Sequence, residues 1–111
     1  MDRMQSLGEL ELLVLLAVAR LGSDAYGVTI AREIEAAGKR YVALGSVYAA
    51  LERLEKKGLA SSALGEATQE RGGRAKRYFS VTAKGIRAAR STRESFMAMW
   101  DRIPLLEGGT I

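Results

Sequence analysis

The N-terminal segment from Leu7 to Leu21 is apolar on nearly every face, and this feature constrains the fold more than any other. Ser6 and Glu9 have the spacing of a capping box, which predicts that a helix begins there and continues to Leu21. A helix without a polar stripe must be buried all round. In a chain of 111 residues, such burial is difficult without a second subunit. The sequence therefore predicts one domain that oligomerises.

Two further helices are predicted before residue 59. Asp24 is a candidate N-cap for a helix that continues to about Ala37, and Gly38 ends it. Ser46 is a candidate cap for the next helix, which Gly58 ends. The connection between the two helices, GKRYVALG, is longer than in a tight helix-turn-helix. In the later helix the following residues are expected to point inward: Val47, Leu51 and Leu54. These are expected to point outward: Ala49, Ala50, Arg53 and Lys57.

The apolar pattern changes to that of strands after Gly58. Residues 59–66 and 74–81 have the composition and alternation of strands, and residues 66–73 contain turn residues that end in a glycine pair. This pattern predicts a β-hairpin.

The last predicted element is a helix capped by Thr82 that runs to about Ile103. Three helices, a hairpin and one more helix follow the order of a winged helix-turn-helix, a mainly α fold with a small β-hairpin. We expect this domain over residues 1–81, a C-terminal dimerisation helix over residues 82–103, and a flexible tail over residues 104–111.

Positive charge is concentrated in the middle of the chain. Residues 1–38 carry three basic and six acidic side chains, residues 39–77 carry nine and four, and residues 78–111 carry five and three. Two interpretations explain this distribution equally well. Either the domain has one face that binds an anionic ligand, or its surface is basic and simply solvated.

The predicted hairpin and third helix contain the residues expected to contact a nucleic acid. Guanidinium groups on a glycine-bearing turn can bind phosphate or enter a minor groove. Small side chains allow a helix to lie deeply in the major groove. The sequence leaves two interpretations open for Tyr48. Its ring belongs to the core in both, and its hydroxyl binds a phosphate in only one of them. The candidate contacts on the helix are Ser46, Tyr48, Ala49, Ala50 and Arg53. Those on the hairpin are Arg71, Arg74, Lys76 and Arg77.

Three segments resemble the PadR family of transcriptional regulators: DAYGVTIAREIE, LGSVYAALERLEKKGL and GEATQERGGRAKRYFSVTAKG. Their order and spacing extend the resemblance over residues 7 to about 86. The resemblance implies a winged-helix homodimer that binds a palindromic operator in double-stranded DNA, usually as a repressor. It also implies that the third helix and the wing, which is the predicted β-hairpin, contact DNA, and that the last helix forms the dimer.

A seven-residue repeat on the last helix supports a dimer interface. Ile86, Arg93 and Trp100 are seven apart, as are Ala89, Phe96 and Ile103, so the helix has a short a/d seam. Packing this helix against its mate or against the first helix would bury the two aromatic residues. The expected dimer interface contains Leu13, Leu16, Ile86, Phe96, Trp100 and Ile103.

Phe96, Met97 and Trp100 allow two interpretations. The resemblance to drug-sensing members implies a cavity between subunits, where a small, flat aromatic effector could stack. Aromatic residues and methionine at helical spacing are more often packing alone, which favours a dimer core.

The sequence argues against an enzyme. Without histidine and cysteine, the chain lacks the commonest general base and metal ligands, and it has no phosphate-binding loop motif. We expect no catalytic residue, no metal and no cofactor. The longest apolar run, Leu12 to Ala19, is too short for a membrane span, and the N-terminus lacks a signal-peptide pattern. These observations predict a cytoplasmic regulator without a membrane partner. The alternative is a winged-helix module that binds RNA or protein, because fold does not fix function.

Overall fold

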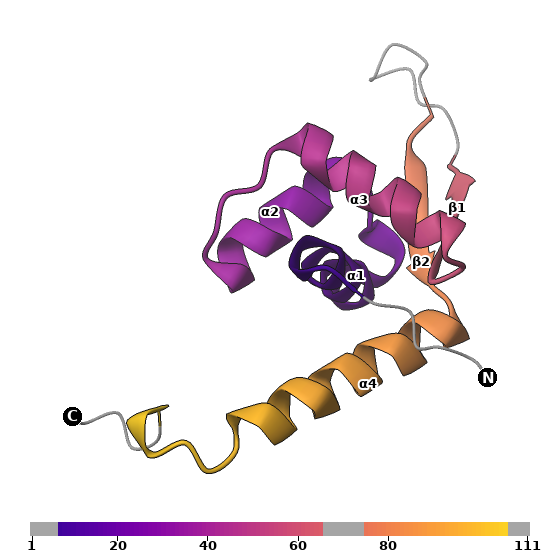
Figure 1. Ribbon diagram of the computed structural model, residues 1–111. Coiled ribbons are helices and arrows are strands. Elements are labelled where there is room, and N and C mark those ends of the chain that lie inside the picture. The colour runs from indigo at the N-terminus through magenta and orange to yellow at the C-terminus, as the bar shows by residue number, and fades with distance from the viewer. Residues whose placement is uncertain (1–6, 66–74, 107–111) are drawn as a thin grey trace.

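The structure is a computed structural model that describes residues 7–65 and 75–106. It is mainly helical, with one two-stranded antiparallel sheet, and it has the predicted order of a winged helix-turn-helix with an additional C-terminal helix (Figure 1). The predicted fold class is therefore confirmed. The elements are α1 (Glu9–Leu21), η1 (Gly22–Asp24), α2 (Gly27–Gly38), α3 (Leu44–Lys56), β1 (Ala60–Leu64), β2 (Arg77–Val81), α4 (Ala83–Trp100) and η3 (Pro104–Leu106).

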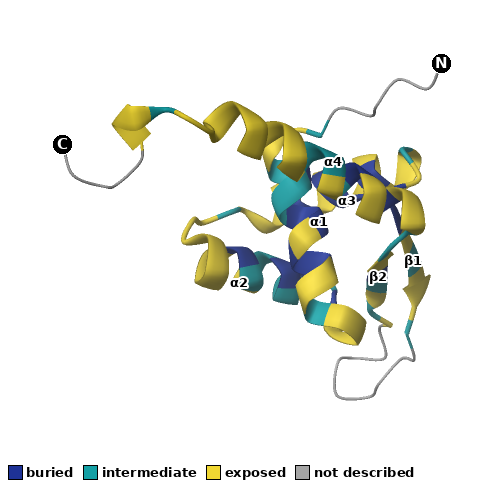
Figure 2. Cartoon of the chain, turned by 90° about the horizontal axis from the view of Figure 1, so that it is seen from below, coloured by how far each residue is buried: buried dark blue, intermediate teal, exposed yellow. Residues whose placement is uncertain are grey.

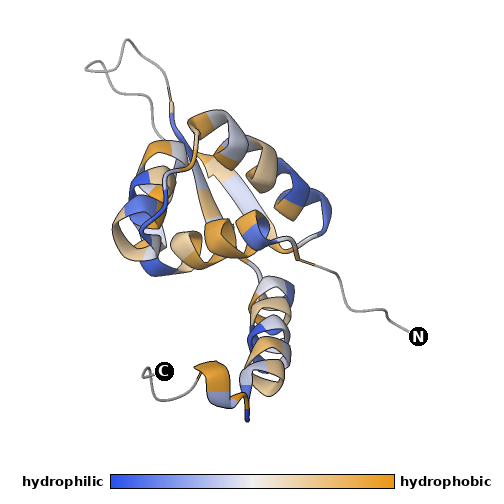
Figure 3. Ribbon diagram, turned by 60° about the vertical axis from the view of Figure 1, so that its left-hand side comes forward, coloured by the Kyte–Doolittle hydropathy of each residue, from blue (hydrophilic) through white to orange (hydrophobic). Residues whose placement is uncertain are grey.

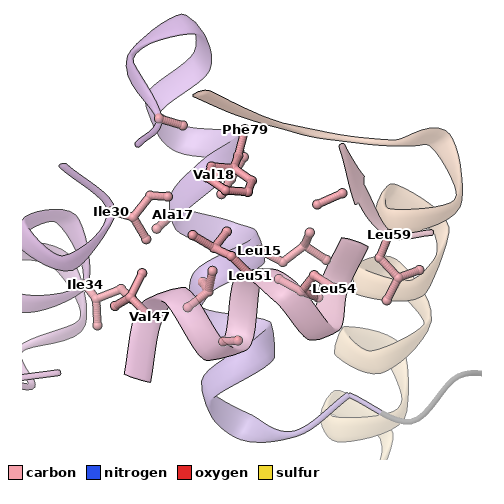
Figure 4. Close-up of a cluster of buried hydrophobic side chains, with 14 of the residues drawn as sticks. Leu15, Ala17, Val18, Ile30, Ile34, Val47, Leu51, Leu54, Leu59 and Phe79 are labelled. Carbon is pink, nitrogen blue, oxygen red and sulfur yellow. The ribbon is translucent and has the colours of Figure 1, made fainter. Parts of the chain in front are cut away.

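The hydrophobic core lies where α1, α2, α3 and the hairpin meet (Figure 4). Burial of these apolar side chains is the main force that holds the four elements together. The single chain does not bury α1 all round, because Leu16 is 43% exposed, and the expected covering by a second subunit stays a prediction. The core includes Leu15, Val18, Ile30, Ile34, Val47, Leu51, Leu54, Leu59 and Phe79.

The first two helices begin later than their predicted caps. α1 begins at Glu9 after Gly8, whose backbone N–H donates to Glu11 Oε1 at 3.2 Å, and Ser6 lies outside the described residues. Asp24 belongs to the short η1 instead of capping α2. Thr29 Oγ1 accepts the hydrogen bond from the Tyr26 backbone N–H at 3.0 Å, so a hydroxyl inside the first turn satisfies the N-cap of α2.

The predicted connection between α2 and α3 is too long. Gly38 is the last residue of α2, and Lys39 follows in the left-handed conformation with φ 57°. α3 begins at Leu44 after an N-cap at Ala43 that has no side-chain hydrogen bond. Ser46 is therefore inside the helix, and its exposed hydroxyl is not used as a cap.

The hairpin is joined to the helices through backbone hydrogen bonds. β1 and β2 pair from Ala60 with Val81 to Leu64 with Arg77. The Phe79 N–H donates to the Ala25 carbonyl at 2.8 Å, which attaches β2 to the segment before α2. This bond fixes the base of the wing next to the helix-turn-helix.

The helix α4 starts against the hairpin and then leaves the body of the domain on the side away from α3 (Figure 1). The predicted cap is present, because the Gly85 N–H donates to Thr82 Oγ1 at 3.0 Å. The predicted end is wrong, since the helix stops at Trp100 and not at Ile103. Pro104–Leu106 form a 3₁₀ turn where a flexible tail was expected, and residues 107–111 lie outside the described residues.

Within residues 7–65 and 75–106, no single helix is both long and apolar enough to cross a membrane. One bent pair, Glu9–Asp24 with Gly27–Gly38, passes the same length and composition test, with 119° between its parts.

Candidate nucleic-acid interface

The side of α3 that faces away from the core carries four exposed residues. With 3.6 residues per turn, they fall opposite the buried Val47, Leu51 and Leu54. We call this surface the outer face of α3, and it consists of Gly45, Ala49, Glu52 and Lys56. Of these, only Ala49 was predicted to contact nucleic acid. The other three could have been found by extending the helical period from the inward-pointing residues.

Ala50 does not belong to this surface, and its expected contact with bases is wrong. Its exposed fraction is 0%. Ala50 follows Val47 by three residues and precedes Leu54 by four, so helical geometry places it on the core side.

Tyr48 lies at the edge of the outer face and is half-exposed. Its ring rests against the start of α2 at Gly27: a Cβ atom added at Gly27 would lie 2.4 Å from Tyr48 Oη. The hydroxyl is therefore at the N-terminus of α2.

Arg53 is on the flank of α3 that faces α1. Its Nε donates to Glu11 Oε2 at 2.8 Å, and Lys57 Nζ donates to Glu11 Oε1 at 2.8 Å. Glu11 is only 5% exposed. Burial alone would raise the pKa of Glu11, but hydrogen bonds from Lys57, Arg53 and the Gly8 N–H outweigh it and hold the pKa below its ordinary value. Glu11 is therefore an anion that joins α1 to the flank of α3.

Lys76 is fixed beside α2, at the loop end of the hairpin. Its Nζ lies 4.0 Å from the centre of the Tyr26 ring, and the rings of Tyr26 and Tyr78 pack edge to face with centroids 5.5 Å apart. A cation over an aromatic face is held by the negative potential of the ring. Lys76 thus adds positive charge next to the N-terminus of α2.

Arg77 points to the other face of β2, because side chains alternate along a strand. Its Nη1 donates to Ser62 Oγ at 3.0 Å, and Ser62 Oγ donates to Glu55 Oε2 at 2.7 Å. This chain of hydrogen bonds connects β2, β1 and the C-terminal half of α3. The structure therefore places Lys76 beside the N-terminus of α2 and Arg77 beside the C-terminal half of α3, while Arg71 and Arg74 lie outside the described residues.

The residues expected at the dimer interface lie on α1 and α4, except Ile103, which follows the end of α4. A groove of about 350 Å³ between these helices is lined by Leu12, Leu16, Ala89, Arg90, Arg93, Phe96 and Met97. Phe96 and Ile86 are exposed, whereas Leu13 and Ile103 are half-buried. Trp100 lines a different hollow, of about 480 Å³, together with Arg93, Glu94, Met97, Ala98 and Asp101. Within this chain, Met97 is the candidate effector residue that borders both spaces.

The described residues contain no group of three or more acidic, histidine or cysteine side chains that could hold a metal ion. The outer face of α3 combines two small residues with one carboxylate and one ammonium group, and Lys76 adds a cation beside α2.

Comparison with known proteins gives one family. The model described as the transcriptional regulator PadR-like family matches residues 14–91. Among curated proteins, none matches the chain.

Solved structures share the fold over most of the chain. A transcriptional regulator from Clostridium thermocellum has 23% sequence identity and a TM-score of 0.72, covering 88% of this chain and 89% of its own. A PadR-like transcription factor from Bacteroides fragilis has 27% identity and a TM-score of 0.69, covering 83% and 84%. A PadR family regulator from Clostridium difficile has 21% identity and a TM-score of 0.70, covering 91% and 100%.

Proposed function

The chain belongs to the PadR-like family of transcriptional regulators, and from this membership we propose that it is a homodimeric repressor that binds a palindromic operator. Binding of double-stranded DNA through α3 and the wing is the function that the geometry supports best. We also propose that the protein is cytoplasmic, as expected from the sequence, and that it has no catalytic role.

The observation that carries the proposal is the outer face of α3. Gly45 and Ala49 are exposed and small, so the N-terminal half of this helix can approach the floor of a major groove closely. Glu52 can accept a hydrogen bond from the N4 amino group of cytosine, and Lys56 can bind a phosphate. Ser46 supplies a hydroxyl that can serve either role.

The edges of this surface can hold the DNA backbone. Tyr48 places its hydroxyl at the N-terminus of α2, where backbone N–H groups favour an anion. Lys76 is held next to the same helix end by Tyr26. These groups suit contacts to phosphates, which position a protein on the duplex without reading its sequence.

A homodimer is supported by the apolar side chains that the single chain leaves uncovered. Leu16 on α1 and Phe96 and Trp100 on α4 are all exposed, the last two at 60% and 56%. Figure 2 shows that α4 is largely exposed, and Figure 3 shows apolar residues distributed along it. A second copy packed on this side would bury the apolar surface and present two α3 helices to one duplex.

Selection of bound duplexes from a random pool, followed by a salt titration, tests the proposed function. We expect an enriched palindrome whose half-sites are about one helical turn apart, and an affinity that falls steeply as salt rises. If no duplex is enriched, or if binding does not depend on salt, the DNA-binding proposal fails. A reporter driven by the selected site then tests repression, which predicts lower expression when the protein is present.

The alternative, a module that binds RNA or protein, makes different predictions. A protein-binding module would enrich no duplex. An RNA-binding module would prefer single strands or A-form helices to the same sequence in B-form DNA. Enrichment of a duplex excludes the protein-binding module, and competition of that duplex with an RNA of identical sequence distinguishes DNA binding from RNA binding.

A small aromatic effector is a second part of the proposal. It is favoured by the apolar groove of about 350 Å³ between α1 and α4, which Phe96 and Met97 line. Tryptophan fluorescence can detect such a ligand, because Trp100 is the chain's single tryptophan. Phenolic acids, planar cations and flavin-like compounds are suitable probes. If none of them quenches the fluorescence, this part of the proposal fails for those ligands, and packing alone explains the residues.

A further inference from the structure

The Glu11 carboxylate is buried against the flank of α3, although it belongs to α1. It accepts hydrogen bonds from Arg53 Nε and Lys57 Nζ, both at 2.8 Å, and from the Gly8 N–H at 3.2 Å. A buried charge is costly unless it is paired, and here two cations pair with one anion. Glu11 therefore neutralises part of the positive charge of the helix that is proposed to meet DNA.

Only one of the three guanidinium nitrogens of Arg53 pairs with Glu11. Glu11 occupies only the Nε position, and within residues 7–65 and 75–106 the guanidinium has no other protein partner. The Arg53 side chain is 50% exposed, so Nη1 and Nη2 can reach a ligand in solution. A planar guanidinium that is held at one position presents its remaining donors in a fixed direction.

The position of Arg53 on α3 indicates what those donors meet. Arg53 precedes Lys57 by four residues on the flank next to α1, about 40° around the helix from Ala49 and about 60° from Lys56 on the outer face. When a helix lies in a major groove, its flanks lie next to the sugar-phosphate backbones that border the groove. The remaining donors of Arg53 are thus suited to a phosphate at the groove edge.

We propose that Glu11 is a positioning residue that holds Arg53 so that Nη1 and Nη2 bind one backbone phosphate of the operator. This inference rests on the proposed DNA-binding function and deepens it. Glu11 itself does not touch DNA. It converts a flexible surface arginine into an oriented phosphate ligand.

Two explanations of the role of Glu11, an electrostatic one and a positioning one, predict opposite effects on DNA affinity when Glu11 is neutralised. Replacing an anion near a DNA-binding surface raises the net positive charge, so electrostatics alone predicts tighter binding. If Glu11 orients Arg53, Glu11→Gln instead weakens binding, because the freed side chain must be ordered again on the phosphate. The sign of the change therefore separates the two explanations. Glutamine retains the size of the side chain and an oxygen that can accept from the Gly8 N–H.

The experiment measures affinity for the selected duplex at several salt concentrations. The variants are Glu11→Gln, Arg53→Ala and the double variant, together with Arg53→Lys. The matched control is Glu33→Gln, because Glu33 pairs with Arg20 Nε in the same way but lies on α2 away from the outer face of α3. The thermal unfolding of each variant is measured first, and binding is then measured at a temperature at which all variants are folded.

We expect Glu11→Gln and Arg53→Ala each to weaken binding by about tenfold and to lower the salt slope by about one unit. The double variant should bind like Arg53→Ala alone. Arg53→Lys retains a cation near Glu11 but lacks the fork of donors, so it should also weaken binding severalfold. Glu33→Gln should bind like the wild type.

Unchanged or tighter binding by Glu11→Gln overturns the inference, as does a double variant whose losses add. If Glu11→Gln does not fold, Arg53→Lys decides, and wild-type affinity in that variant overturns the inference. These results differ from failure of the proposed function, in which the wild-type protein itself enriches no duplex.

Discussion

Tyr48 lies across the first turn of α2 at Gly27, and only the absence of a side chain on Gly27 makes room for it. A Cβ atom at Gly27 would be 2.4 Å from Tyr48 Oη and 2.5 Å from Cζ. The Tyr48 ring thus adds a contact between the two helices of the helix-turn-helix at the edge of the proposed DNA surface, beside the core residues that they share. This contact explains why Tyr48 is half-exposed instead of buried in the core.

Gly27→Ala should displace the Tyr48 ring. The new methyl group cannot occupy the same space as the ring, so the hydroxyl leaves the N-terminus of α2. We expect a severalfold loss of affinity for the selected duplex, measured by fluorescence anisotropy. Gly38→Ala is the matched control, because a Cβ there meets only Ile34 Cγ2 at an ordinary 3.8 Å. Equal affinities for the Gly27 variant and the wild type would show that Tyr48 has no role in binding.

Ala49→Leu and Ala50→Leu should separate binding from folding, although the two residues are adjacent. Ala49 is exposed on the outer face of α3, so leucine there should lower DNA affinity at least about tenfold and change the free energy of unfolding by less than about 0.5 kcal/mol. Ala50 is fully buried, so leucine there should cost about 1–3 kcal/mol of stability. Denaturant unfolding and duplex binding check both variants, and the reverse pattern would contradict the placement of α3.

The Glu11 ion pairs predict a pH dependence of stability. The pKa of Glu11 in the folded chain lies below its ordinary value of 4.5, so the folded state favours the anion. Its stabilising contribution is complete above the ordinary value and is lost as pH falls through the lower, folded pKa. At pH 7, Glu11→Gln should cost about 1–2 kcal/mol, a modest figure because Arg53 is half-exposed.

The difference in unfolding free energy between the wild type and Glu11→Gln should shrink as the solution is acidified below pH 4.5. Denaturant unfolding at a series of pH values measures it. A difference that stays constant down to the acid unfolding of the protein would mean that the carboxylate charge contributes no stability.

Phe96→Glu should prevent the chain from forming the proposed dimer. A charge in the apolar groove between α1 and α4 cannot be buried against a second copy without a partner. Sedimentation velocity should show a monomer for this variant and a dimer for the wild type. Met99→Glu is the control, since Met99 is 76% exposed and is not among the residues that line the groove. A dimer in both variants would place the interface elsewhere.

Much of the fold is predictable from periodicity. The inward positions Val47, Leu51 and Leu54 are buried as predicted, and Thr82 caps α4 as predicted. Both signals depend only on residues near in sequence, which is why the sequence alone reveals them.

The errors come from interactions between residues that sequence rules do not bring together. Ser46 resembles an N-cap, but α3 starts two residues earlier, at Leu44, after an N-cap at Ala43 that makes no side-chain hydrogen bond. Ala50 is small and could face either side, and only its packing against the core decides. The pairing of Glu11 with Arg53 spans 42 positions in sequence, so no local pattern predicts it.

The most direct test of the proposed interface uses the absence of cysteine from the chain. A single cysteine introduced by Lys56→Cys on the outer face of α3, or by Ser95→Cys on α4, can carry a tethered iron chelate that cleaves nearby DNA. At protein concentrations that saturate the selected duplex, the chelate at position 56 should cut within the half-sites, and the chelate at position 95 should produce only background cleavage. Cleavage from position 95 without cleavage from position 56 would contradict DNA binding through α3.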